Sequence, residues 1–353
     1  MKKQIFYPVL LSYFLLIGNF YAQNSESSDT SEKVTKLFRS EKILPIKLSY
    51  SNKDVERNTN DSTYIKTDLS YQEDDGTWKT LEVEIRARGN FRRKNCYFPP
   101  IKLKIKKSAA KETLFKGNKK IKLVLPCLKA KNINDNLMKE FIAYKLYENI
   151  SPYHFKTRLV SVNLTEDRGK RTFEHELMGI LLEDDKNLEK RLNCNEMKRF
   201  IHPLGQDDLS SVQNAFFQFM IANTDFSTAY QHNEKLFFID KKMVPVPYDF
   251  DMSGLVDASY AVVSQIAKEE LPITDVKQRM YRGFKRDPTI YKEVRKLYLD
   301  KKSDLLAVFD TYESLFYDKR EFGMAKQFIL DFYEIISNEN SYHDKIISQA
   351  RTK

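Results

Sequence analysis

The chain has 353 residues, and its 59 Lys and Arg outnumber its 49 Asp and Glu to give a formal net charge of +10. That length allows one large domain or two smaller lobes, each with a buried core. The three cysteines, Cys96, Cys127 and Cys194, are too few and too scattered for a disulfide-rich scaffold or a CxxC metal site, and leave open one disulfide bond with one free thiol.

Residues 1–22 are typical of a secretory signal peptide. Lys2 and Lys3 precede an apolar stretch at 5–20, and Ala22 offers a small residue for cleavage. The alternative is an uncleaved N-terminal anchor, because the apolar stretch is near the lower length limit for a spanning helix. Cleavage would lower the net charge from +10 to +8 and leave no transmembrane segment in the mature chain. We therefore expect an exported protein, either periplasmic, on the cell surface or secreted.

The region after the signal peptide is predicted to be a disordered linker at 23–40, because it begins with a run of Ser, Asp, Glu and Asn. A β-rich N-lobe is predicted for 41–185. Apolar and charged residues alternate at 81–88 and again at 101–106, which is the two-residue period of half-buried strands. The sequence therefore predicts an antiparallel sheet with one solvated face in this lobe.

Helices become frequent further along the chain. Apolar residues at three- and four-residue spacing predict a helix at 208–222, directly before a polar loop. A β-rich first half joined to a mostly helical C-lobe at 186–353 predicts an α+β protein of two lobes with a cleft between them. The other predicted elements are a helix at 134–148, strands at 155–164 and 177–183, and helices at 275–284, 289–315 and 319–337.

The segment 86–122 is strongly basic, with fourteen Lys or Arg and a single acid, Glu112. Such a density could bind polyphosphate or an acidic envelope surface, and the alternative for most of these lysines is a solvated outer face of the sheet. Lys102 and Lys104 share one face of an apolar-alternating strand, so at least one of them could point into the cleft. Nucleic acid is not expected, because no RRM, KH or zinc-finger pattern occurs in an exported chain.

Several common catalytic patterns are missing. The sequence contains no GxGxxG or Walker A loop, no GxSxG elbow and no HExxH motif, and its five histidines show no paired ligand spacing. Binding of phosphate by the common glycine-rich loops, serine hydrolase chemistry and zinc chemistry are therefore not expected.

The segment 223–251 contains the residue types that phosphoryl transfer requires. Asp225 follows the predicted helix 208–222, Asn233 precedes a short apolar strand, and Asp249 and Asp251 follow the next strand. One carboxylate can accept the proton of an attacking hydroxyl, while an amide and further carboxylates can hold Mg²⁺ near phosphates. The alternative for each acid is a turn residue that binds local backbone amides.

Short motifs with the same order and spacing occur in a known family. The chain resembles the spore-coat protein H (CotH) kinase-like family over roughly residues 80–285. The motifs are Arg88-Gly89-Asn90, the basic strand 100–104, the helix 137–147, the strand Met178-Gly179-Ile180-Leu181-Leu182-Glu183, Asn223-Thr224-Asp225, and the segment 247–251.

The resemblance implies an atypical protein-kinase-like fold, with ATP and Mg²⁺ or Mn²⁺ as cofactors. Asp225 would be the catalytic base, and Asp249 the first metal ligand, with Asp251 and Asn233 beside it. Kinases carry the metal-binding Asn five residues after the base, where this chain has Tyr230, so Asn233 would serve from a longer loop. The glycine that follows the metal-binding Asp in kinases is also missing here.

The resemblance further implies how the nucleotide would be held. Lys104, or failing that Lys102, would contact the phosphates, and Glu140 would pair with that lysine from the helix. Glu183 would lie near the adenine.

We therefore expect an exported kinase-like enzyme that transfers the γ-phosphate of ATP to Ser or Thr hydroxyls of an envelope or surface protein. The alternative is a catalytically inactive binding module for an acidic envelope partner. A third hypothesis, a polysaccharide hydrolase with Asp225 and Asp249 as its two carboxylates, lacks the tryptophan-rich platform common in sugar sites, since Trp78 is the single tryptophan.

Overall fold

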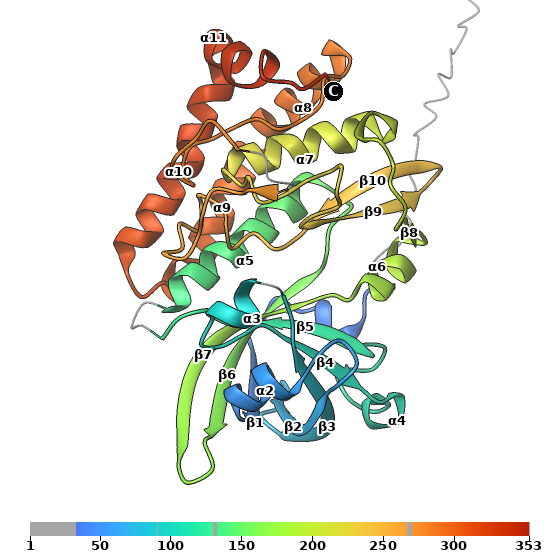
Figure 1. Ribbon diagram of the computed structural model, residues 1–353, viewed down its shortest axis with the longest axis vertical. Coiled ribbons are helices and arrows are strands. Elements are labelled where there is room, and N and C mark those ends of the chain that lie inside the picture. Colours follow the sequence, from blue (N-terminus) through green and yellow to red (C-terminus); the bar gives the residue numbers. More distant parts are fainter. Residues whose placement is uncertain (1–32, 90, 130–132, 267–269, 353) are drawn as a thin grey trace, which may run out of the picture.

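The computed structural model describes residues 33–89, 91–129, 133–266 and 270–352. A β-barrel lies at one end of the molecule and most of the helices lie at the other, with α5 (Ile133–Ile150) between them (Figure 1). The predicted signal peptide 1–22 and most of the predicted linker lie outside the described residues. No helix in the described part of the chain combines the length and the apolar character that crossing a membrane requires.

The barrel has seven strands in the order β1-β2-β3-β4-β5-β7-β6. Neighbours in this order pair antiparallel, and the barrel is closed by parallel pairing of β1 with β6, for example Ile46 with Val162. The strands are β1 Leu44–Tyr50, β2 Ile65–Gln72, β3 Trp78–Ala87, β4 Ile101–Ile105, β5 Lys120–Val124, β6 Thr157–Asp167 and β7 Thr172–Leu182.

The predicted two-lobed, kinase-like fold with an antiparallel sheet is wrong, because the sheet closes on itself. Both an open sheet and a barrel bury every second side chain, so the alternation at 81–88 and 101–106 does not distinguish them. What decides between them is the pairing of β1 with β6, strands that are distant in the sequence. The buried face of the strands becomes the inside of the barrel, where Val83, Ile85 and Leu103 form part of one hydrophobic cluster.

Short helices flank the strands of the barrel. Residues 36–38, at the end of the predicted linker, form the 3₁₀ helix η1 (Lys36–Phe38), and its Leu37 and Phe38 are buried against the barrel cluster. The others are α2 Asn52–Asn58, α3 Phe91–Asn95 and α4 Lys107–Ala110.

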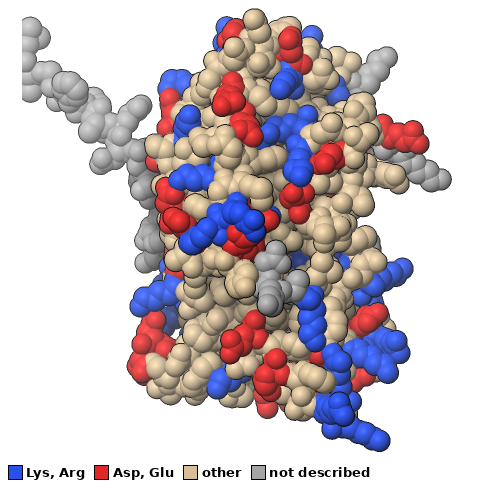
Figure 2. Space-filling model, turned by 90° about the vertical axis from the view of Figure 1, so that its left-hand side faces the viewer, with Lys and Arg blue, Asp and Glu red and all other residues tan. Residues whose placement is uncertain are grey.

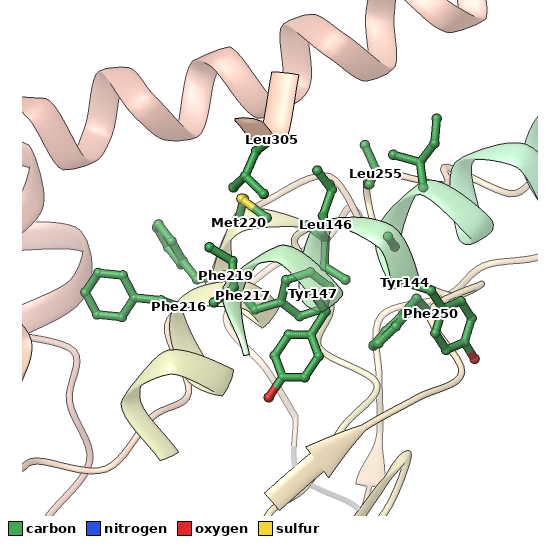
Figure 3. Close-up of a cluster of buried hydrophobic side chains, with 14 of the residues drawn as sticks. Tyr144, Leu146, Tyr147, Phe216, Phe217, Phe219, Met220, Phe250, Leu255 and Leu305 are labelled. Carbon is green, nitrogen blue, oxygen red and sulfur yellow. The ribbon is translucent and has the colours of Figure 1, made fainter. Parts of the chain in front are cut away.

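A second hydrophobic cluster holds the helical end together. α5 is buried on nearly all sides, and its Tyr144, Leu146 and Tyr147 pack against Phe217 of α7 and Phe250 (Figure 3). A three-stranded sheet, β10-β9-β8, covers part of this cluster. The elements are α6 Asp185–Leu192, β8 Asn195–Glu196, η2 Pro203–Gly205, α7 Asp208–Met220, β9 Glu234–Ile239, β10 Lys242–Pro247, α8 Pro288–Asp300, α9 Lys302–Tyr312, η4 Glu313–Leu315, α10 Lys319–Ser337, α11 Glu339–Tyr342 and η5 His343–Ile347.

The segment 275–284 is not helical, although its pattern predicts a helix. Its side chains make long-range contacts instead: Arg279 donates to the carbonyl of Met220, and Arg282 donates to the carbonyl of Thr224 at 2.6 Å. A Cβ at Gly283 would lie 2.8 Å from the Cβ of Ala215 on α7. Tertiary packing therefore overrides local helix propensity in this segment.

Candidate functional site

The loop after α7 positions Asp225. α7 begins at the cap Asp207, which accepts a hydrogen bond from the backbone N–H of Ser210, and it ends at Met220. Asn223 then turns the chain: its backbone N–H donates to the carbonyl of Gln218 at 2.8 Å, and its Oδ1 accepts from the N–H of Asp225 at 2.9 Å. This side-chain turn directs Asp225 out of the helix.

Three side chains surround the carboxylate of Asp225. Nδ2 of Asn233 donates to its Oδ2 at 2.8 Å and to its backbone carbonyl at 2.7 Å. The hydroxyl of Ser264 donates to Oδ1 at 3.2 Å, and Nε2 of His232 lies 3.3 Å from the same oxygen. The hydrogen bond with Asp225 raises the pKa of His232. The side chain of Asp225 is 24 % exposed, so it is oriented by these partners while remaining accessible.

Asp249 follows β10 in a left-handed backbone conformation, with φ of 66°. Its backbone N–H donates to the phenol oxygen of Tyr144 on α5 at 2.9 Å. Its carboxylate lies 3.9 Å from a guanidinium nitrogen of Arg88, which directly follows Ala87, the last residue of β3. A non-glycine residue at positive φ is strained, and the bond to Tyr144 helps to hold Asp249 in place.

A buried network joins Asp251 and Glu140 through one guanidinium. Nε of Arg92, on α3, lies 3.6 Å from Asp251, and its Nη1 lies 3.4 Å from Oε2 of Glu140 on α5. The phenol of Tyr260 donates to Asp251 at 3.2 Å. Arg92 also donates to the carbonyl of Leu125 at 2.7 Å, so it ties α3 to the end of β5.

Burial and mutual repulsion shift the pKa values of these acids. Burial raises the pKa of Asp251. The charge of Arg92 lowers that pKa, and the charges of Asp249 and Asp225 raise it further. Burial likewise raises the pKa of Glu140. The charge of Arg92 lowers that pKa, and the charges of Asp251 and Asp249 raise it. The carboxylates of Glu140, Asp225, Asp249 and Asp251 therefore form one electrostatic group, which we call the acid cluster.

A cationic group lies beside the acid cluster. Lys122 of β5 is paired in register with Lys102 of β4, and Nζ of Lys122 lies 3.0 Å from Asp185. Nζ of Lys102 lies 3.4 Å from Asp184. Burial lowers the pKa of Lys122, while Asp185 opposes that change and the charge of Arg88 adds to it. The same Arg88 contacts Asp249, so it links the two groups.

Two residues assigned to nucleotide binding have other partners. Glu183 is buried and bound by Arg191 at 2.8 and 3.1 Å, and it also accepts from the backbone N–H of Lys156. Lys104 has a side chain that is 46 % exposed, and its Nζ pairs with Glu84 of β3 at 2.6 Å. Contacts or charge interactions thus join Glu140, Asp225, Asn233, Asp249 and Asp251. The ion pairs of Lys102, Lys104 and Glu183 are instead with Asp184, Glu84 and Arg191.

Sequence reasoning assigned no role to several residues that line the site. Lys122 is buried, and its Nζ lies 4.9 Å from the ring centroid of Tyr248 and 5.1 Å from that of Phe155. It alternates with Ile121 and Leu123 as Lys102 does with its own neighbours, and that signal could have identified it. Arg88, Arg92, His232 and Ser264 contact the cluster from segments whose proximity follows from tertiary structure.

The acid cluster suits a divalent cation by its chemistry. Carboxylate and amide oxygens are the ligands that Mg²⁺ prefers, and three of the four acids, Asp249, Glu140 and Asp251, contact the two guanidiniums of Arg88 and Arg92. Oε1 of Glu140 is buried without a hydrogen-bond partner. Within the described residues no three His, Cys, Asp or Glu side chains form a preformed metal-binding group. A cation held here would offset the repulsion among the carboxylates that Arg88 and Arg92 do not cancel.

A cavity of about 290 Å³ adjoins the buried network, and Arg92, Glu140 and Tyr260 form part of its wall. Cys127 also lines it. Cys127 forms a disulfide bond with Cys96, which directly follows α3, while Cys194 is a buried free thiol. The disulfide thus attaches the helix that carries Arg92 to the segment between β5 and α5.

Comparison of the chain with models of known protein families gave no match, and comparison with curated protein sequences gave none either.

Proposed function

We propose that this protein is an exported phosphotransferase that moves the γ-phosphate of ATP to Ser or Thr hydroxyls of an envelope or surface protein. The observation that carries the proposal is the contact of Asp225 with a serine hydroxyl. Its carboxylate is oriented by Asn233 through Oδ2 and accepts from Ser264 through Oδ1. A carboxylate within hydrogen-bond reach of a hydroxyl is placed to accept its proton during attack.

The family resemblance supports the same assignment. The Asn223-Thr224-Asp225 motif and the segment 247–251, which resemble landmarks of the CotH kinase-like family, supply Asp225, Asp249 and Asp251. Asp225 comes from a different loop than Asp249 and Asp251, yet the charges of Asp225 and Asp249 both act on Asp251. We assign Asp225 as the catalytic base on this combined ground.

Positive charge for the phosphates would come from Lys122, with Lys102 and Arg88 beside it. Arg88 contacts Asp249, and its charge also acts on Lys122, whereas Lys104 pairs with Glu84. Lysine and arginine donors neutralise the charge that develops on phosphate oxygens during transfer.

Asp249, Asp251 and Asn233 would hold Mg²⁺ or Mn²⁺, which when bound supplies positive charge between the phosphate groups. Tyr144 fixes the backbone of Asp249, and Arg92 fixes Asp251 through a charged contact of 3.6 Å. Among the predicted ligands, Asn233 also orients Asp225, so it would serve both the base and the metal.

The disulfide bond between Cys96 and Cys127 supports export. Structural disulfides persist in oxidising compartments and are rare in the cytosol. The bond therefore agrees with the signal-peptide-like residues 1–22 in favouring a location outside the cytoplasm.

A transfer assay with the purified protein tests the proposal. The protein is incubated with γ-labelled ATP, Mg²⁺ or Mn²⁺ and dephosphorylated casein as an acceptor, and label in protein is measured. Loss of a general base lowers the rate by about 10²–10⁴-fold, so we expect that loss for Asp225→Asn. Asp304→Asn, at an exposed acid of α9, is the matched control and keeps the wild-type rate. Equal labelling by wild type and Asp225→Asn would remove Asp225 from the mechanism.

The second candidate is an inactive module that binds an acidic envelope partner. It is favoured by the arginine contacts of Asp249 and Asp251, which already offset part of the charge a metal would meet. On the face seen in Figure 2, positive side chains run together along one edge of the barrel end, while both signs are interspersed over the helical end. Binding to an anionic surface without nucleotide-dependent stabilisation or label transfer would favour this candidate.

A further inference from the structure

A single serine of this chain occupies the position of an acceptor hydroxyl at Asp225. Ser264 is 5 % exposed, and its Oγ donates to Oδ1 of Asp225 at 3.2 Å. Asn233 binds the other carboxylate oxygen, Oδ2, while Oδ1 accepts from Ser264 and lies 3.3 Å from Nε2 of His232, so Oδ1 is the oxygen that already meets a hydroxyl. An acceptor protein that uses Asp225 as its base must place its hydroxyl at this same oxygen.

The surrounding segment presents Ser264 as a peptide substrate would. It follows Asp251 along the chain without regular helix or strand from 261 to 265. The neighbours on either side, Val263 and Gln265, line a surface hollow of about 500 Å³, whereas Ser264 turns inward to Asp225. The hollow is also lined by Ala261 and Val262. One inward hydroxyl between outward-facing neighbours is the arrangement expected for an extended acceptor.

We propose that Ser264 is an intramolecular phosphorylation site. The inference rests on the proposed function and identifies its first acceptor. Oγ of Ser264 attacks the γ-phosphorus of a nucleoside triphosphate, and its proton passes to the carboxylate of Asp225. The Oγ–P bond forms as the bond from the γ-phosphorus to the β–γ bridging oxygen breaks, and the nucleoside diphosphate leaves with that electron pair.

The product would clear the acceptor position. A phosphoserine carries about −1.5 to −2 charges at neutral pH. At residue 264 that charge would face Asp225, with Asp249 and Asp251 close enough to act electrostatically on the same site. Repulsion between like charges would displace the segment from Asp225, so an external acceptor could then reach the base. Modification of Ser264 therefore precedes transfer to other proteins.

Phosphopeptide mapping tests the proposal. The protein is incubated with ATP and Mg²⁺ or Mn²⁺, and phosphate is located by mass spectrometry. We expect phosphate on Ser264, a loss of more than about tenfold in Ser264→Ala, and retention on residue 264 in Ser264→Thr, which keeps a hydroxyl. Ser259→Ala, at an exposed serine five residues before Ser264, is the matched control and keeps the label.

Two kinetic results separate this site from alternatives. A reaction within one molecule has a rate constant independent of protein concentration, and Asp225→Asn protein mixed with active protein stays unlabelled at Ser264. Ser264→Ala should phosphorylate casein without a lag, whereas wild type should show one. A slower rate on casein in Ser264→Ala, with no lag in either protein, would mean that Ser264 only orients Asp225, and would overturn the proposal.

The outcomes also distinguish this inference from the proposed function. Phosphate transfer to casein with Ser264 unmodified would refute the intramolecular site and leave the phosphotransferase intact. No transfer to casein or to Ser264, together with no stabilisation by nucleotide, would refute both.

Discussion

Arg92 holds two buried carboxylates that belong to different parts of the chain. Glu140 lies on α5 and Asp251 follows β10, and both depend on this guanidinium for compensating charge. Removing one member of a buried ionic network leaves uncompensated charge, which costs far more than the pair itself contributes. At the scale of single residues, the candidate site is therefore stabilised by Arg92.

Arg92→Ala should destabilise the protein by about 3–5 kcal/mol at pH 8. Lys104→Ala, which breaks an exposed pair with Glu84, should cost less than about 1 kcal/mol and serves as the control. Because burial raises the pKa values of Glu140 and Asp251, both acids take up protons more readily as the pH falls. The loss in Arg92→Ala should therefore be smaller at pH 5 than at pH 8. Urea unfolding at both pH values measures this, and an equal loss would contradict the account.

The pKa of His232 reports directly on its contact with Asp225. The hydrogen bond raises that pKa above 6.5 because the carboxylate favours the protonated imidazole. In Asp225→Asn the neutral amide has no such charge, whereas the burial of His232 still lowers its pKa. The pKa of His232 should therefore fall toward or below 6.5. NMR titration of the imidazole resonances measures the change, and His343→Gln, at an exposed histidine, helps to assign the spectrum. An unchanged pKa of His232 would show that the two side chains are apart in solution.

At the scale of elements, the close contact of β7 with its neighbours depends on Gly179. A Cβ at this position would lie 2.9 Å from Cγ2 of Val160 and 3.0 Å from Cδ1 of Leu123. Both contacts are with side chains inside the barrel. Gly179, in the motif strand 178–183, is therefore explained by packing between β5, β6 and β7.

Gly179→Ala should lower the free energy of unfolding by about 1–3 kcal/mol, because an added methyl group in a filled core forces neighbours to shift. Gly205→Ala is the matched control, since its Cβ would meet Ile201 at an ordinary 3.7 Å. Thermal or urea unfolding gives both values. Equal stability of the two variants would mean that the barrel interior has room at β7.

Sequence periodicity located some elements and not others. The helix predicted at 319–337 has the bounds of α10, whose N-cap Asp318 accepts from the N–H of Arg320. The helix predicted at 289–315 is divided at Lys301 into α8 and α9. The helix predicted at 275–284 is absent, because Arg279 and Arg282 bind carbonyls of distant residues. Caps and apolar spacing are local signals, whereas these contacts are not.

The candidate site shows the same division. Asp225, Asn233 and Asp249 were predicted to meet from their order along the chain, and contacts or charge interactions join them in the structure. The sequence could not predict which lysine lies near these residues, because the register between β4 and β5 decides it. Lys102 faces Lys122 across β4 and β5, while Lys104 faces Lys120 and pairs with Glu84.

At the scale of the whole molecule, the disulfide bond connects the barrel with the network at α5. Cys96 and Cys127 are separated by 31 residues, and a loop of that length loses conformational freedom in the unfolded chain when it is closed. Reduction should therefore destabilise the protein by roughly 3–4 kcal/mol. A reducing agent should lower the melting temperature of wild type and leave that of Cys96→Ser/Cys127→Ser unchanged. The same shift in both would assign it to a cause other than this bond.

The central claim is that the acid cluster and the neighbouring cationic side chains bind a metal–nucleotide complex. The most direct measurement is the melting temperature of the protein with ATP and Mg²⁺, compared with ATP alone and with Mg²⁺ alone. A ligand at about 100 times its dissociation constant stabilises by about 2.7 kcal/mol, which is a shift of several degrees for a protein of this size. The account predicts that shift only when both are present, and its loss in Asp249→Asn. No shift, or an undiminished shift in Asp249→Asn, would contradict it.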